Sequence, residues 1–375
     1  NDNTVRFCTT GYGVKVVGNV CATTFYGSGA NLTNLPGFEP DGQQNLYAGT
    51  GAGAASDADT CFNIALGCNA GNALNAGDYN VFLGCNAGYC TTDGGCNFAV
   101  GNSAGRCRNA GDNIFIGKYT GMGCNGAAGG CNIALGPHAG QCGTTGQKNI
   151  FLGFSAGKNS TTGSCNIFFG VEAGEQNTTT SENVFIGFNA GRCSRGLQNI
   201  FLGKKAGTGS ATPANNTGSY NLFLGFYSGV SNIGGQYNVF LGAYSGYCNT
   251  TGNCNFAVGY VAAKCRNSCT GIFIGKYAGM GCNGATGSDN IALGSHAGRC
   301  GTTGDQNIFL GNAAGQCATT AAYNVILGYG AGKCNTTGDC NIFLGSEAGG
   351  SNAITGNNNI AAGRLAGASL TSGCN

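Results

Sequence analysis

Apolar and polar residues follow one short pattern along most of the chain. The phrase Asn-(Ile/Val)-Phe-Leu-Gly-x-x-Ala-Gly recurs 19 times, and its copies begin at residues 45, 63, 80, 97, 113, 132, 149, 166, 183, 199, 221, 238, 255, 271, 290, 307, 324, 341 and 359. Most copies start 17 residues apart, but the spacing is 22 residues once, where residues 210–215 form an insertion, and 19 residues twice, near Met122 and Met280. A fixed period of this kind predicts a repeat architecture with its insertions in loops.

Each copy opens with a run that predicts a strand. In residues 149–153, apolar β-branched and aromatic residues lie between two turn formers, which indicates a strand of about four residues. A unit of 17 residues is too short to hold both a strand and a crossover helix. The pattern therefore predicts an all-β fold, a parallel β-solenoid (β-roll or β-helix) of about 19 coils. At roughly 4.8 Å per coil, such a rod is about 90 Å long.

Several positions of the repeat, counted from its opening Asn as position 1, are nearly invariant along the chain. Gly occupies position 5 in all 19 copies and position 9 in 18, with Ala263 as the exception. Such columns predict either a positive φ at a corner or a backbone approach too close for a Cβ atom. Asn opens 18 copies, and Gly271 replaces it once. Stacked Asn side chains predict a ladder of hydrogen bonds along the rod.

The pattern divides the chain into three parts. Residues 1–44, with alternating Val14, Val16 and Val20, are expected to form a β-rich joint; residues 45–367 form the repeat rod; residues 368–375 form a C-terminal tail. A shift of 158 residues aligns residues 80–136 with 238–294 at 39 of 57 positions. A block of nine repeats was therefore duplicated, which favours growth of a rod over the evolution of a pocket.

Position 3 of the repeat carries a stripe of large aromatic side chains. Positions 2 and 4 point to one face of the strand and position 3 to the other, and both faces are apolar. An exposed phenylalanine stripe would exceed what a monomer tolerates, so we expect a second chain to cover it. The alternative is that these rings point into a wide coil. The stripe comprises Phe82, Phe115, Phe151, Phe168, Phe185, Phe201, Phe223, Phe240, Phe273, Phe309 and Phe343.

The 23 cysteines indicate an oxidising, extracellular location, because the chain has no CxxC pair typical of zinc sites. Many occupy position 11, and a second set directly precedes the opening Asn. Cysteines at position 11 of adjacent coils could form disulfide rungs, whereas pairs such as Cys90/Cys96 could close a turn within one coil. The candidate disulfide cysteines are Cys90, Cys96, Cys107, Cys124, Cys248, Cys254, Cys265, Cys282, Cys300, Cys317, Cys334 and Cys340. An odd count leaves one thiol free or bonded between chains.

Composition excludes several classes of protein. Only 9% of residues are charged and the net charge is +2, so the chain lacks the basic surface that nucleic-acid binding needs. No run reaches the roughly 18 apolar residues of a membrane span, so no membrane insertion is expected. The chain is 42% apolar with only 4 Pro, which is not the composition of a disordered protein.

Other polar features point to no enzyme, metal or cofactor. His138 and His296 are copies of one position, each with a cysteine four residues on, and are expected to be surface histidines. No catalytic triad or carboxylate pair surrounds them, so no catalytic residue is assigned. Eight Thr-Thr pairs within the repeats suggest ice binding only as a minor alternative. Six sequons are candidate glycosylation sites: Asn31, Asn159, Asn177, Asn215, Asn249 and Asn335.

The repeat resembles two known groups. The phrase at residues 238–242, followed by Asn-Thr-Thr-Gly at 249–252, is similar to repeats of tail-fibre-like and surface-fibre proteins of phages and bacteria, which often end in an endosialidase-type chaperone domain. It is more distantly similar to the head repeats of trimeric autotransporter adhesins. Residues 25–36 also resemble a Gly-Ser-Gly linker common in such fibres. The resemblance covers residues 45–367 and implies a homotrimer on the cell or virion surface.

Together these features predict a non-enzymatic structural subunit of an extracellular fibre. Its partner would be itself, as a homotrimer, an end-to-end polymer or both, with residues 1–44 as the joint. The alternative is an adhesin or tail-fibre shaft that binds cell-surface glycans, for which the insertion at residues 210–217 is the strongest departure from the repeat.

Overall fold

The computed structural model describes residues 6–10, 13–17, 40–123, 127–210, 216–281, 284–350 and 352–373. The chain forms two compact units, Asn1–Glu39 and Pro40–Asn375. In the first unit, β1 (Arg6–Thr10) and β2 (Gly13–Val17) pair as an antiparallel hairpin. The division falls a few residues before the expected boundary at 44, because the Asp41 carboxylate already accepts the Asn45 amide of the first coil at 2.8 Å.

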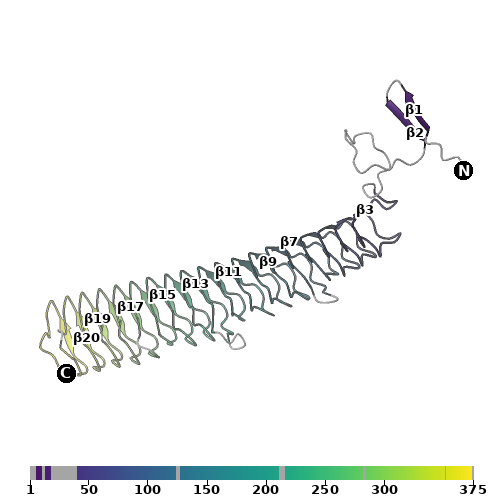
Figure 1. Ribbon diagram of the computed structural model, residues 1–375. Coiled ribbons are helices and arrows are strands. Elements are labelled where there is room, and N and C mark those ends of the chain that lie inside the picture. Colours follow the sequence, from purple (N-terminus) through teal and green to yellow (C-terminus); the bar gives the residue numbers. More distant parts are fainter. Residues whose placement is uncertain are drawn as a thin grey trace. The chain divides into compact units, whose positions relative to one another are not determined.

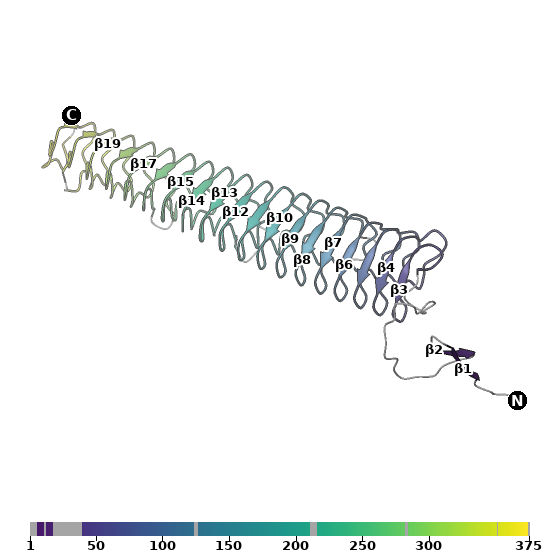
Figure 2. The same ribbon diagram turned by 90° about the horizontal axis from the view of Figure 1, so that it is seen from above.

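The second unit is a parallel β-solenoid with no helix among its described residues, which confirms the predicted fold class. One three-residue strand per coil pairs in parallel and in register with the strands of the adjacent coils. Figure 1 and Figure 2 show the coils stacked along one axis with these strands as a single ladder. The strands are β3 (Leu46–Ala48), β4 (Ile64–Leu66), β5 (Val81–Leu83), β6 (Phe98–Val100), β7 (Ile114–Ile116), β8 (Ile133–Leu135), β9 (Ile150–Leu152), β10 (Ile167–Phe169), β11 (Val184–Ile186), β12 (Ile200–Leu202), β13 (Leu222–Leu224), β14 (Val239–Leu241), β15 (Phe256–Val258), β16 (Ile272–Ile274), β17 (Ile291–Leu293), β18 (Ile308–Leu310), β19 (Val325–Leu327), β20 (Ile342–Leu344) and β21 (Ile360–Ala362).

The last coil extends beyond the expected end of the rod. The side chain of Asn359 donates from Nδ2 to the carbonyl of Gly373 at 2.8 Å. Leu370 packs against the hydrophobic core. Residues 368–373 therefore complete a coil and do not form a separate tail.

The core is filled by position 3, so the phenylalanines lie inside the coil. Phe168, Phe185 and Phe223 have no exposed surface, and adjacent rings from Phe151 to Phe240 stack with centroids 4.8–5.2 Å apart. The expectation that a second chain covers this stripe is wrong. A parallel ladder places equivalent side chains one strand spacing apart, at which phenyl rings stack face to face.

In four of the six coils where position 3 is Ala, a larger residue at position 12 enters the core. Ala65 is paired with Leu74, which is fully buried, and Ala361 is paired with Leu370. Each coil therefore holds about one large inward side chain, as the native packing density of protein interiors requires.

Two buried arginines also fill the core space that Ala leaves at position 3, and each reaches across several coils. Arg108, at position 12 of the coil with Ala99, places its guanidinium 5.3 Å from the centroid of the Phe115 ring in the next coil. Its Nε donates to the carbonyl of Gly121 at 2.9 Å. The head group reaches as far as Gly143, in a coil whose position 3 is again Ala. A cavity of about 10 Å³ remains there, the size of roughly one water molecule.

Arg266 repeats this arrangement in the duplicated block. Its guanidinium donates to the carbonyls of Gly279 at 2.9 Å, Gly287 at 3.0 Å and Gly301 at 3.4 Å, and lies 5.1 Å from the Phe273 centroid. Burial lowers the pKa of Arg266 to about 10, because the charged form loses its hydration. The coils that receive these arginines are the two 19-residue coils, so the added residues enclose a cation.

The glycine columns have both of the expected causes. At position 5, Gly153 has a φ of +129°, and a Cβ there would lie 2.7 Å from the carbonyl oxygen of Gly170 in the next coil. At position 9, Gly157 has a φ of +56°, and a Cβ would lie 2.6 Å from the ring of Phe151. The exception, Ala263, is in a coil with Ala257 at position 3, so no ring obstructs its Cβ.

The opening asparagines form the expected ladder. In a typical step, the backbone amide and Nδ2 of Asn166 donate to Oδ1 of Asn149 at 3.0 and 3.1 Å. Nδ2 also donates to the carbonyl of Thr180 at 2.9 Å. Each buried carboxamide thus ties the start of one strand to the preceding coil and to the turn of its own coil.

The contact between positions 3 and 9 predicts strong coupling in a double-mutant cycle. We expect Gly157→Ala to destabilise the protein, because its Cβ would overlap Phe151, and Phe151→Ala to cost about 3–5 kcal/mol through its cavity. In the double variant the clash is absent, so its cost should be smaller than the sum by about 1 kcal/mol or more. Urea denaturation measures these values, and simple additivity would contradict the contact.

The packing and hydrogen bonds of the buried Arg266 side chain predict that it contributes to the free energy of unfolding. We expect Arg266→Ala to cost about 3 kcal/mol, because it opens a cavity and leaves carbonyls without donors. Arg266→Met should cost less, since it retains most of the volume. Arg364→Ala, at an exposed side chain, is the matched control and should change stability by less than about 0.5 kcal/mol. Equal denaturation midpoints for the Ala and Met variants would show that packing around the arginine is unimportant.

Candidate functional site

The most extensive surface feature is the outer face of the strand ladder. We define the outer sheet face as the side chains at positions 2 and 4 of β3 to β21. All 38 of these residues are apolar, from Leu46 and Ala48 to Ile360 and Ala362. Inside the ladder, Phe169 is 54% exposed and Ile200 is 42% exposed. The surface that could receive a second chain is thus this face. Its residues at positions 2 and 4 directly precede and follow the phenylalanine position in each strand.

A column of exposed residues borders this face on one side. We call position 17, which precedes the opening Asn, the edge column. All 19 of its residues adopt a left-handed conformation with φ between 54° and 64°, although none is Gly. Cys96, Cys131, Cys165, Cys254 and Cys340 lie in this column and are exposed. Tyr220 and Tyr237 also lie there and stack with centroids 4.8 Å apart.

Some of the cysteines at position 11 contact one another along the rod, and one pair is bonded. Cys248 and Cys265 form a disulfide between adjacent coils, with Cα atoms 4.1 Å apart. The thiols of Cys90 and Cys107 are hydrogen-bonded. Burial is the main cause that raises the pKa of Cys334, and the nearby Cys317 thiol raises it further. The pairing within one turn that the sequence left open, as in Cys90/Cys96, Cys248/Cys254 and Cys334/Cys340, is not formed in the described residues.

Not every candidate cysteine can be placed. Cys124 and Cys282 lie outside the described residues. Cys300 is half-buried at position 11, one coil before Cys317. Three consecutive coils therefore carry Cys300, Cys317 and Cys334 in one column.

The two histidines lie beside tyrosine rings on the coil surface. His138 bonds from Nδ1 to Gln141 Oε1 at 2.9 Å, and its ring lies 5.4 Å from that of Tyr119. His296 lies 5.0 Å from the Tyr277 ring in the equivalent arrangement. Burial first, then the charges of Arg299 and Lys276, lower the pKa of His296. Both rings are half-buried, and no three His, Cys, Asp or Glu side chains of the described residues gather as metal ligands.

Three of the candidate glycosylation sites are incompatible with the fold. Asn177, Asn249 and Asn335 lie at position 12 and are buried. Asn335, for example, donates from Nδ2 to the carbonyl of Gly338 at 3.0 Å. A glycan cannot attach to these side chains in the folded rod. Asn159 is half-buried at position 11, and Asn31 and Asn215 lie outside the described residues.

The threonine pairs are also partly engaged by the fold. The first Thr of a pair turns its hydroxyl to the next coil, as when Thr161 donates from Oγ1 to the Thr178 carbonyl at 3.0 Å. Thr319 donates in the same way to the carbonyl of Thr336 at 2.9 Å. These hydroxyls support the backbone ladder, while the second Thr of these two pairs, Thr162 and Thr320, is exposed.

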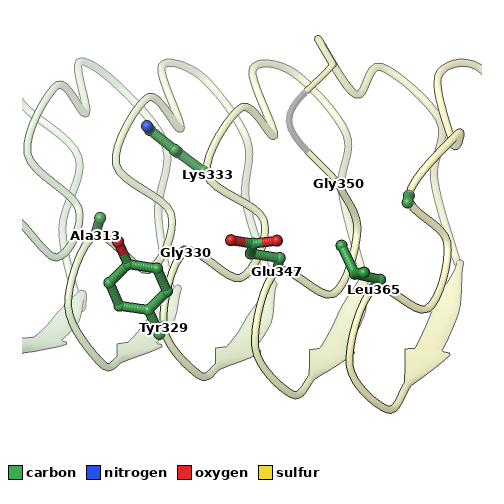
Figure 3. A pocket seen from close by; sticks show the side chains of 8 residues that line it. Ala313, Tyr329, Gly330, Lys333, Glu347, Gly350 and Leu365 are labelled. Carbon is green, nitrogen blue, oxygen red and sulfur yellow. The ribbon is translucent and has the colours of Figure 1, made fainter.

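Two surface regions of the described residues depart from the repeat, whereas most of the insertion at residues 210–217 lies outside them. An aromatic cluster on adjacent coils has ring centroids 4.3–6.2 Å apart and contains Phe226, Tyr227, Tyr244, Tyr247, Tyr260, Tyr277 and His296. Nearer the C-terminus, a groove of about 260 Å³ opens where Gly330 replaces a larger residue at position 7. Figure 3 shows Lys333, Glu347 and Leu365 around this groove, beside the ring of Tyr329.

Comparisons with known proteins give no family or relative. No family model, curated protein or solved structure matches the chain. Within the described parts of the chain, there is also no helix with the length and hydropathy of a membrane span.

Burial at position 11 predicts that Cys107 reacts much more slowly with thiol reagents than an exposed cysteine does. Burial, together with the hydrogen bond to Cys90, raises the pKa of Cys107 to about 12. In reduced native protein at pH 8, we expect iodoacetamide to modify Cys107 at least about 100-fold more slowly than the exposed Cys340, because the thiolate is the nucleophile. Peptide mass spectrometry measures both rates, and denatured protein is the control in which they should converge. Similar rates in native protein would contradict the buried position.

Proposed function

We propose that the chain is a structural subunit of an extracellular fibre, and that its rods associate side by side as a homotrimer. The observation that carries this proposal is the outer sheet face, an unbroken apolar surface along all 19 strands. Soluble monomers rarely expose contiguous apolar patches above a few hundred Å². A strand of three residues is about 10 Å wide, so a rod of roughly 90 Å offers on the order of 900 Å². Stable interfaces bury about 800 Å² per partner.

The surface favours another copy of the chain as the partner. The face repeats once per coil, so a second rod offers ridges at the same spacing. The few charges and a net charge of +2 create little repulsion between copies. The resemblance to trimeric fibre proteins agrees with three rods around one apolar axis.

The mechanical properties follow from the coil. Backbone hydrogen bonds, the asparagine ladder and stacked phenyl rings all run along the rod axis. The disulfide between Cys248 and Cys265 adds a covalent rung and fits an oxidising location outside the cell. End-to-end polymerisation through residues 1–44 stays a prediction, because most of that segment lies outside the described residues.

Glycan binding is the second candidate function. The aromatic cluster and the groove beside Tyr329 favour it, since exposed aromatic rings and a few polar groups suit sugar recognition. Lys205 lies 5.2 Å from the Tyr227 centroid and Lys276 lies 5.3 Å from that of Tyr277, so cations border the rings. Both features lie outside the strand ladder, so a glycan-binding shaft could retain the same trimer axis.

Charge substitution on the outer sheet face tests the proposed association. We expect the double variant Ile167→Lys and Ile200→Lys to weaken self-association at least about 100-fold, because two ammonium groups would be buried in an apolar interface. Both side chains are exposed in the single chain, so folding should be retained. Sedimentation velocity under reducing conditions measures the oligomeric state. Thr162→Lys, at an exposed turn position, is the control and should leave it unchanged. A wild-type chain that sediments as a monomer would refute the proposal.

A further inference from the structure

We propose that one corner of the rod binds an acidic polysaccharide, a sugar polymer that carries carboxylate or sulfate groups. The inference rests on the proposed function in its second form, glycan binding, and adds the chemical class of the glycan and the place where it binds. It does not depend on association of the rods, because the corner lies outside the outer sheet face. We define the basic corner as the side chains at positions 6, 7 and 10 of the six coils that open at residues 199, 221, 238, 255, 271 and 290.

The net charge of +2 is unevenly distributed along the chain. Residues 183–288 contain seven of the 17 Lys and Arg residues and none of the 15 Asp and Glu residues. The rest of the chain contains ten Lys and Arg residues and all 15 acidic residues. This part of the rod is therefore basic, whereas the remainder of the chain is acidic.

Five cations lie on the basic corner, and no acidic residue does. Ring centroids 4.3 Å apart for Phe226 and Tyr227, and 6.2 Å apart for Tyr227 and Tyr247, place positions 6, 7 and 10 side by side. Among the described residues, Arg192 alone forms ion pairs, so no carboxylate neutralises the cations of the corner. These cations are Lys204, Lys205, Lys264, Lys276 and Arg299.

Aromatic rings hold the cations in place along the corner. Lys205 Nζ lies 5.2 Å from the Tyr227 centroid, and Arg299 Cζ lies 5.4 Å from the Tyr277 centroid. A cation at this distance is attracted by the π-system of the ring. The charged groups are thus ordered before a ligand arrives, which lowers the entropic cost of binding.

The surroundings of His296 report the same positive charge. Burial first, and then the charges of Arg299 and Lys276, lower its pKa, so two cations lie close enough to disfavour protonation of the ring. A carboxylate or sulfate bound beside these cations would face attraction from both of them.

The spacing of the charges favours a polysaccharide over a nucleic acid. The corner holds five cations over five strand spacings of about 4.8 Å, which is roughly one positive charge per coil. Double-stranded DNA carries one negative charge per about 1.7 Å, roughly three times that density. A polymer with one anion per sugar is closer to the density of the corner. The tyrosine rings also offer flat apolar surface to the C–H faces of sugars, whereas the bases of a duplex face inward.

The duplicated block provides an internal comparison. The first block has cations at two of the equivalent positions, but it has asparagine where the basic corner has two tyrosines, and two acidic residues where the second block has threonine. The equivalent pairs are Arg106/Lys264, Lys118/Lys276, Asn86/Tyr244, Asn102/Tyr260, Asp93/Thr251 and Asp112/Thr270. We therefore expect the first block to bind an acidic polymer less tightly, and it supplies a matched control.

The full chain provides the test, with three polymers as probes. Polygalacturonate carries carboxylates, dextran sulfate carries sulfates, and dextran is the neutral polymer. Isothermal titration calorimetry at physiological ionic strength measures their dissociation constants. We expect at least one acidic polymer to bind at least about 10-fold more tightly than dextran, and the two acidic probes show which anionic group is preferred.

Substitutions then locate the binding surface. The double variant Lys264→Gln with Lys276→Gln should weaken binding of the acidic polymer at least about 10-fold. The matched control, Arg106→Gln with Lys118→Gln, removes the same charge from the first block and should change the affinity by less than about twofold. Tyr244→Asn keeps a residue that tolerates the left-handed φ of 58° and should weaken binding at least about 3-fold. Sedimentation velocity of each variant checks that its fold and oligomeric state are unchanged.

The outcomes separate this inference from the proposed function. Dextran bound as tightly as the acidic polymers would overturn the inference and leave glycan binding in place. Equal losses in the two double variants, or tighter binding of a short DNA duplex than of either acidic polymer, would also overturn it. If none of the three polymers bound, the inference and glycan binding would both be wrong. A monomeric wild-type chain would overturn the homotrimer alone, since the basic corner belongs to a single chain.

Discussion

The stack of opening asparagines holds the solenoid in register, and the other features of the rod depend on it. Each carboxamide lies at the start of a strand, accepts the next coil's amide and side chain, and donates into its own turn. This fixes each coil one strand spacing from the next. At Gly271, where the side chain is missing, the backbone amide still donates to Asn255 Oδ1 at 3.1 Å, but Asn290 in the following coil has no carboxamide oxygen at this position to donate to.

That spacing accounts for both the core and the outer surface. Coils so close together leave no room for a Cβ at position 5, and they stack the phenyl rings of position 3 at 4.8–5.2 Å. The same ladder aligns the outward residues of every strand into one apolar face. The repeat therefore produces an apolar surface whose exposure to water is unfavourable for a single chain. Association of chains removes this surface from water.

Much of the fold could be predicted from the sequence, because a fixed period reports on stacking directly. The error concerned which strand face lies inside. Alternation with a period of 2 separates two faces but does not say which is buried when both are apolar. A second signal was present: the coils with Ala65 and Ala99 carry Leu74 and Arg108 nine residues later, as expected if position 3 and position 12 share one interior. The edge column could not be predicted, since Cys, Tyr and Asp in a left-handed conformation carry no signature like that of Gly.

The central claim is that rods lie side by side through the outer sheet face. Mass per unit length of the native protein, measured by scanning transmission electron microscopy, tests this most directly. We predict the mass of three chains within each length of about 90 Å, one coil stack beside another. A rod with the mass of a single chain over that length would show that the apolar face stays uncovered by other copies, and would contradict the account.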